Sequence, residues 1–288
     1  MFKYHRQSRA GFAFIIFFFL SLQLIAQQRT LFTGTPEAGS VIIGRADKIK
    51  SIIFEKKKLN FSKDGYFVFG FDRDAKGKYV LKITFKDKKT ETYTYQIEPR
   101  EYEVQRINGL PKNMVTPSKK IRARIAKETK IIAQQKKAMF TDYNAYLKNG
   151  FITPVDSVDI RSLFGSARIL DGIKKNPHNG IDFGADEGTP VKAAGDGVVL
   201  VAQHNFYYNG TFVMIDHGLG LITIYLHLSR LDVKKGDKVK KGEIIGAVGS
   251  TGRATGPHLH FGVELFKKRI DPMSILQLKT GGQEETSK

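Results

Sequence analysis

The chain has 288 residues, no cysteine and a formal net charge of +19 at pH 7. Without cysteine, a disulfide framework and lipid attachment through a cysteine are excluded. The charge favours polyanions such as anionic envelope polymers, although a solvated basic surface explains it equally well. The lysines are dispersed rather than joined to a DNA or RNA motif, so no nucleic acid is expected as a partner.

Residues 1–26 have the organisation of a secretory signal peptide. Three basic residues precede an apolar run over 11–25, and the small residue Ala26 follows it. A membrane anchor is the alternative, but this run is interrupted by Ser21 and Gln23 and is shorter than the roughly 20 residues that span a bilayer. We therefore predict cleavage near Ala26 and export to the periplasm, the cell envelope or the extracellular space.

Residues 29–112 alternate apolar and polar side chains, which indicates short β-strands. The clearest pattern is a hairpin in which 79–85 and 92–97 flank a turn at 87–89. The sum is a small β-sandwich-like N-terminal domain. This domain has no cluster of ionisable residues suited to catalysis. Its role could therefore be to bind a partner, to act as a spacer or to cover a catalytic groove, and all three stay open.

Residues 116–150 are predicted to form a helical connector. Thr116 is a suitable N-cap residue for a helix, and Pro117 suits the first helical position. Asn149-Gly150 is typical of a helix end. One long helix or two broken near Thr141 fit the spacing. The apolar residues at helical spacing, Met139, Tyr143 and Tyr146 among them, indicate a packing surface.

Residues 151–276 are rich in glycine and β-branched residues, and the final segment, 277–288, is a polar tail. The composition predicts an antiparallel β domain, and the whole chain is expected to be mainly β. The expected strands are 151–158, 180–183, 197–202, 211–216, 221–227, 244–248 and 258–265.

Four histidines and one aspartate stand in three short blocks of this domain: His178, Asp182, His227, His258 and His260. Alternation along a strand gives His258 and His260 one face, and an extended segment gives His178 and Asp182 another shared face. Hydrolytic zinc takes three ligands from histidine and carboxylate and keeps a fourth position open. The set therefore predicts one zinc ion, with two imidazoles left for proton transfer and oxyanion stabilisation.

From about Phe151 to Ile275 the sequence resembles the lysostaphin-type murein metallopeptidases, which are zinc endopeptidases that cut peptide cross-links in peptidoglycan. The matching motifs include HNGID at 178–182, YLHLS at 225–229 and GSTGRATGPHLHFGVE at 249–264. The region before 117 resembles N-terminal regions of secreted members more weakly.

This resemblance implies that His178, Asp182 and His260 bind zinc. It implies His258 as the base that acts on water and His227 as the residue that stabilises the tetrahedral intermediate. Tyr225 is a candidate contact to oxyanion or substrate, with a structural role equally open. Leu226 replaces a smaller residue common in the family, which puts substrate choice in question. Peptidoglycan is the implied substrate, but the bond cut, any regulatory envelope protein and the oligomeric state are not predicted.

A second hypothesis is a non-catalytic wall-binding protein or an activator of other murein hydrolases. Family members of that kind have lost metal ligands, whereas every ligand position is filled here. A lysine-rich turn at 233–242 resembles that of biotinyl or lipoyl carriers, but the lysine hairpin motif is missing. The glycine-rich stretch 249–256 lacks the ending of a phosphate loop. His204 and His217 have no partner at ligand spacing and are expected to be surface or structural residues.

Overall fold

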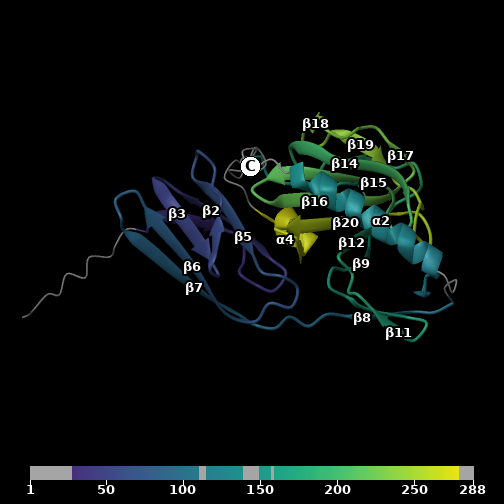
Figure 1. Cartoon of the computed structure of the whole chain (residues 1–288), viewed down its shortest axis with the longest axis horizontal. Coiled ribbons are helices and arrows are strands. Elements are labelled where there is room, and N and C mark those ends of the chain that lie inside the picture. Colours follow the sequence, from purple (N-terminus) through teal and green to yellow (C-terminus); the bar gives the residue numbers. More distant parts are fainter. Residues whose placement is uncertain (1–27, 110–114, 139–148, 157–158, 279–288) are drawn as a thin grey trace, which may run out of the picture.

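The structure is a computed structural model that describes residues 28–109, 115–138, 149–156 and 159–278. The predicted leader at 1–26 lies outside the described residues, as do Met139, Tyr143 and Tyr146 and most of the predicted tail. Among the described residues, no helix is both long and apolar enough to cross a membrane. The chain is mainly β, as the sequence predicts, with antiparallel sheets in both its N-terminal and C-terminal parts (Figure 1).

Two sheets pack face to face in the N-terminal domain, at the purple and blue end of Figure 1. The first has the order β1-β2-β5, with β1 at Thr30–Thr33, β2 at Val41–Ala46 and β5 at Tyr66–Gly70. The second has the order β4-β3-β6-β7, with β4 at Lys57–Leu59, β3 at Ile49–Phe54, β6 at Gly77–Phe85 and β7 at Thr90–Ile97. Inward-facing residues such as Phe67, Phe69, Leu81 and Ile83 fill the space between them. The predicted hairpin is the β6–β7 pair.

The described part of the connector contains the helix α2 at Lys119–Gln135, followed by a 3-10 turn at Lys136–Ala138. The helix begins after Ser118, whose hydroxyl accepts from the N–H of Ile121, and so starts later than predicted from Thr116. Ile131 and Ile132 of α2 pack against a cluster on the C-terminal sheet that includes Phe206 and Phe212.

An eight-stranded antiparallel sheet dominates the C-terminal domain. Its order is β18-β14-β15-β16-β20-β12-β9 with β21 beside β20, and the bounds are β18 Lys238–Val239, β14 Gly197–Phe206, β15 Gly210–Gly218, β16 Leu221–Leu228, β20 His258–Leu265, β12 Gly180–Gly184, β9 Asp159–Ser162 and β21 Lys268–Ile270. A three-stranded sheet of β13 (Pro190–Lys192), β19 (Ile244–Ala247) and β17 (Arg230–Leu231) packs nearby, and the short helix α4 spans Pro272–Leu276.

Six of the seven strands expected in this domain are present. The strand expected at 151–158 is wrong: the described part, 151–156, is irregular. Its backbone makes single hydrogen bonds to the end of β13 and the residues just after it: Ile152 donates to the carbonyl of Ala194, and Lys192 donates to that of Pro154.

A further three-stranded sheet joins residues from both sides of the predicted boundary at 112. Strand β8 at Val104–Ile107 runs parallel to β10 at Ala167–Leu170, which pairs in turn with β11 at Ile173–Lys175. Parallel strands need long connections, and here the whole helical connector lies between β8 and β10. Residues 104–107 therefore belong structurally with the C-terminal domain.

The two domains share one hydrophobic cluster. Val41, Ile43 and Val68 of the first sheet pack in the same buried cluster as Phe164 and Leu265 of the C-terminal domain. Polar contacts surround it: Asp271 N–H donates to the carbonyl of Gly39 at 2.8 Å, and Lys268 pairs with Asp72 at 3.0 Å. The N-terminal domain is thus fixed against one side of the C-terminal domain.

Candidate metal centre

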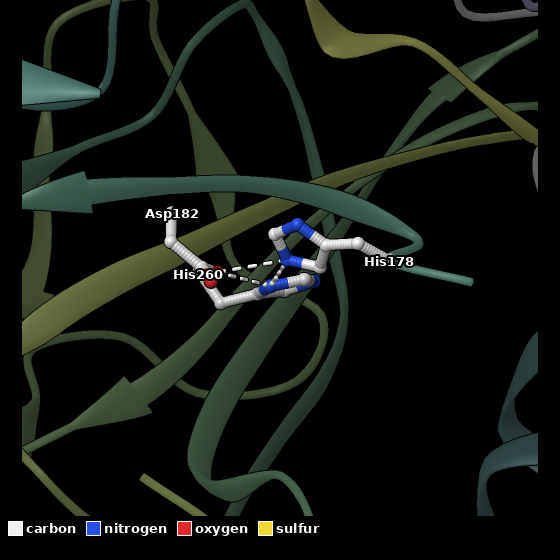
Figure 2. A group of neighbouring side chains, drawn as sticks. All are labelled: His178, Asp182 and His260. Atoms are coloured by element: carbon white, nitrogen blue, oxygen red, sulfur yellow. Dashed lines mark hydrogen bonds and ion pairs between the residues drawn. The ribbon is translucent and has the colours of Figure 1, made fainter. Parts of the chain in front are cut away.

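Three predicted ligands meet at one point, as Figure 2 shows. His178 Nε2 lies 2.9 Å from Asp182 Oδ1 and 3.0 Å from His260 Nδ1, and the last two atoms are 2.7 Å apart. Asp182 and His260 are directly opposite each other in the antiparallel pair β12–β20, which places their side chains on one face. His178 comes from the chain just before β12.

The hydrogen bonds of His178 make this cluster fit a cation. The Leu163 carbonyl, which can only accept, lies 3.0 Å from Nδ1, and Ser162 Oγ lies 2.8 Å from it. A proton on Nδ1 leaves a lone pair on Nε2, aimed at a carboxylate oxygen. Two electron-rich atoms this close need a positive charge between them. Two imidazole nitrogens and one carboxylate oxygen are a donor set that zinc accepts.

The electrostatics of the cluster favour an ionised Asp182 and a neutral His260. Burial alone would raise the pKa of Asp182, but its close contacts with His178 and His260 lower it well below its usual range. Burial lowers the pKa of His260 to about 4, against the opposing effect of Asp182. Neutral imidazole and ionised carboxylate are the forms that bind metal.

Arg168 of β10 holds the second carboxylate oxygen of Asp182, with Nη2 3.2 Å from Oδ2. Its Nε is buried and has no hydrogen-bond partner among the described residues. This guanidinium leaves Oδ1 for the metal and fixes the carboxylate, as outer partners of metal ligands do.

His258 and His227 lie beside the three ligands. His258 donates from Nδ1 to the Gly256 carbonyl at 2.8 Å, and its Nε2 lies 3.9 Å from Asp182 Oδ1. His227 donates from Nδ1 to the Thr251 carbonyl at 2.8 Å, and the two rings are 4.9 Å apart. Burial, with the neighbouring His260 and His258, lowers the pKa of His227 to about 3. Because the Nδ1 proton of each ring is bonded to a carbonyl, the neutral form of each ring has its lone pair on Nε2.

The backbone explains why His227 reaches this face and Tyr225 does not. His227 has φ of 67°, a left-handed conformation that interrupts strand alternation. Tyr225 lies two residues before it and is fully buried, and its hydroxyl accepts from the N–H of Ala194 at 2.8 Å. The suggested contact of Tyr225 to oxyanion or substrate is therefore not what the structure shows; its role is structural.

A groove of about 570 Å³ opens at the cluster. His227, His258, His260 and Asp182 line it, and Asp182 is the single acid among its described lining residues. Its basic residues come from four separate segments: Arg106, Arg161, Arg168 and Arg253. A second hollow of about 470 Å³ shares His227, His260, Arg168 and Arg253 with the groove and includes Leu226.

The described residues of the two N-terminal sheets do not line this groove. The residues before the connector that do are Gln105, Arg106 and Ile107, all from β8. Within the described part of 29–112, the suggestion that this region covers the groove therefore applies to β8 alone.

Sequence reasoning missed the groups that orient the site, namely Ser162, Leu163, Arg168, Thr251 and Gly256. Three of them act through backbone carbonyls, for which no side-chain pattern exists. Nothing in the sequence marks Arg168 as a partner of a metal ligand, because single arginines are common in short strands. His217 is structural, as expected: it is buried, and its Nδ1 donates to the Asp196 carbonyl at 2.7 Å. His204 is exposed.

One part of the chain is similar to known proteins, and it contains His178, Asp182, His227, His258 and His260. Residues 176–272 match the model of peptidase family M23. The chain is 51% identical over 122 residues to the peptidoglycan DD-endopeptidase ShyA of Vibrio cholerae, covering 42% of this chain and 28% of ShyA. It is 46% identical over 98 residues to the DD-carboxypeptidase/endopeptidase Mpg of Neisseria meningitidis, covering 34% of this chain and 22% of Mpg. The chain thus spans less than a third of these relatives.

Among solved structures, a protein from Pseudomonas aeruginosa described as a peptidase M23 matches most of the chain. The TM-score is 0.63 with 27% identity, covering 84% of this chain and 95% of that one. The similarity therefore extends beyond the metal centre into the N-terminal domain.

Proposed function

We propose, because residues 176–272 form a domain of peptidase family M23, that this protein is a zinc metalloendopeptidase that hydrolyses peptide cross-links of bacterial peptidoglycan. The observation that carries the proposal is the meeting of His178, Asp182 and His260, with two further imidazoles beside them. The names of ShyA and Mpg support peptidoglycan as the substrate.

His178 Nε2, Asp182 Oδ1 and His260 Nδ1 would hold the zinc ion. Bound zinc supplies Lewis acidity, which polarises the scissile carbonyl and lowers the pKa of water toward ~7. His258 is placed to take the proton from the attacking water, because its Nδ1–H is bonded to Gly256 and its Nε2 lone pair remains available.

His227 acts with a second Nε2 lone pair at the same groove. Whichever imidazole takes the proton of the attacking water becomes a donor, so it can bond the negative oxygen that develops on the scissile carbonyl and then pass that same proton to the leaving amine. The bond from His227 Nδ1 to the Thr251 carbonyl holds the ring in place for this step.

The groove suits a peptide that carries free carboxylates. Arg106 and Arg253 line it and come from two different segments, whereas Arg168 is already paired with Asp182. Guanidinium groups bind carboxylates with paired hydrogen bonds. Peptidoglycan stem peptides expose such carboxylates beside the cross-link, whereas a glycine bridge has none. We therefore take a DD cross-link between stem peptides as the first substrate to test.

Export completes the proposal. The signal-peptide pattern at 1–26 supports delivery to the compartment where peptidoglycan lies. The alternative of a wall-binding protein or hydrolase activator without catalysis has no specific observation in its favour, since the complete ligand set is assembled.

The test is cleavage of purified sacculi by wild type and a His258→Ala variant. We expect about one zinc per chain in both, and a 10²- to 10⁴-fold lower rate of new amino termini for the variant. The exposed His204→Ala variant is the matched control and should cleave like wild type. Intact sacculi in the presence of zinc-loaded wild type would overturn the enzyme proposal.

Removal of a ligand should have a different signature. We expect His178→Ala to lose stoichiometric zinc as well as activity, because two donors remain of the three. Metal analysis after dialysis measures this, and retention of one tightly bound zinc by the variant would contradict the ligand assignment.

A further inference from the structure

We propose that Arg73 of the N-terminal domain is a positioning residue for the metal ligand His178, so that this domain supports metal binding from behind the site. The connection passes through the loop 163–166, which contacts Arg73 on one side and His178 on the other. The inference rests on the proposed function only for the identity of the ion as zinc.

The first link joins Arg73 to the loop. Its Nε and Nη2 both donate to the Gly165 carbonyl, at 2.8 and 2.6 Å. The guanidinium also lies over the ring of Tyr102, 4.2 Å from its centroid, and the Tyr102 hydroxyl donates to the Arg73 carbonyl at 2.8 Å. Only 20% of the Arg73 side chain is exposed, so it is held in one place.

The second link joins the loop to His178. Gly165 N–H donates to the His178 carbonyl at 2.8 Å, and His178 N–H donates to the Ser166 carbonyl at 2.9 Å. The Leu163 carbonyl then accepts from the imidazole Nδ1 at 3.0 Å. The loop therefore sets both the backbone and the ring of this ligand.

The contact at Gly165 leaves no free space. Gly165 has φ of 81°, and a Cβ there would lie 2.1 Å from the Tyr102 ring. Tyr102 and Arg73 thus contact the backbone of the loop directly. A displacement of the N-terminal domain would therefore move the loop and, with it, the metal ligand His178.

Ligand orientation is sensitive to such outer contacts. Loss of a partner that orients a metal-binding histidine typically lowers metal affinity 10- to 100-fold. Arg73 acts one contact further out, so we expect the lower end of this range. The N-terminal domain would then strengthen the site rather than inhibit it.

The experiment measures zinc affinity of the full-length protein by competition with a chelator of known affinity. We compare wild type, Arg73→Ala and Lys268→Ala. The last is a matched control: it removes the interdomain ion pair with Asp72 and leaves both Arg73 donors to the Gly165 carbonyl in place. Circular dichroism and metal-free melting temperature check folding. Arg73→Gln, which keeps one donor, replaces the alanine variant if that does not fold.

We expect a zinc dissociation constant about tenfold higher for Arg73→Ala, a smaller rise for Arg73→Gln, and no change for Lys268→Ala. Wild-type affinity in the folded Arg73 variant overturns the inference. An equal loss in Lys268→Ala also overturns it, because the effect would then belong to the interface in general. Wild type that binds no zinc would overturn the proposed function itself, before any variant is compared.

Discussion

The metal centre requires glycine at position 180, because the backbone there has no room for one additional carbon atom. A Cβ at Gly180 would lie 2.4 Å from the Phe261 carbonyl oxygen and 2.7 Å from His260 Nε2. The HNGID motif therefore contains a glycine because two strands carrying ligands approach closely there.

We predict that Gly180→Ala displaces His260 and lowers zinc affinity at least tenfold. Gly256→Ala is the matched control, since a Cβ at Gly256 meets no atom within 4 Å and the Gly256 carbonyl bonded to His258 is retained. Isothermal titration with zinc compares the two variants. Equal affinities would show that the close approach can relax without cost to the site.

His217 provides a pH-dependent contribution to stability away from the metal. Burial lowers its pKa to about 4, compared with about 6.5 in the unfolded chain. Between these values the unfolded state binds more protons than the folded state. The contribution of His217 to the free energy of unfolding is therefore fully present above pH 6.5 and decreases as the pH falls toward 4. The difference corresponds to about 3 kcal/mol.

We therefore expect the stability advantage of metal-free wild type over His217→Asn to be greatest at pH 7 and to shrink by up to about 3 kcal/mol at pH 4. Urea unfolding across this range measures it. The exposed His204→Asn variant should follow the wild-type curve. An advantage that stays constant with pH would mean that His217 is not the group responsible.

Sequence patterns predicted the residues of the site better than their orientation. The histidine spacing indicated the correct shared faces for His258 and His260, because alternation is regular in β20. It failed at Tyr225 and His227, where the left-handed backbone at His227 reverses the expected face. Such a conformation in a histidine depends on neighbours, here the Asn209 and Thr251 carbonyls, that no local pattern reveals.

At the scale of elements, the strand β8 is what brings the first part of the chain to the groove. Its pairing with β10 places Arg106 in the lining, beside the histidines. The sequence patterns placed residues 104–107 in the N-terminal domain, because parallel pairing of two strands separated by about sixty residues leaves no local signal.

We predict that Arg106→Gln raises KM about three- to tenfold for cross-linked peptides with free carboxylates, since one charge-assisted hydrogen bond is lost. Substrates whose carboxylates are amidated should be unaffected. Arg230→Gln is the control, because Arg230 is exposed and paired with Asp232 at 2.8 Å, outside the groove lining. Equal effects on both substrates would contradict carboxylate recognition by β8.

At the scale of the whole molecule, the shared cluster of Val41, Ile43 and Val68 with the C-terminal core predicts one cooperative unfolding transition. We expect Val68→Ala to cost about 2 kcal/mol and to shift that single transition of the metal-free protein. Ile53→Ala, at a position 41% exposed, should leave it unchanged. Calorimetry that resolves two transitions, with only one affected by Val68→Ala, would show that the domains unfold separately.

The sheet order has a consequence for biosynthesis. Strand β20 lies between β16 and β12 although it is made after both, and it carries His258 and His260. While the ribosome is still translating the region before it, β16 and β12 have no central partner and the coordination sphere is incomplete. A nascent or truncated polypeptide that ends before residue 258 lacks His260, so the donor set of His178, Asp182 and His260 cannot assemble in it.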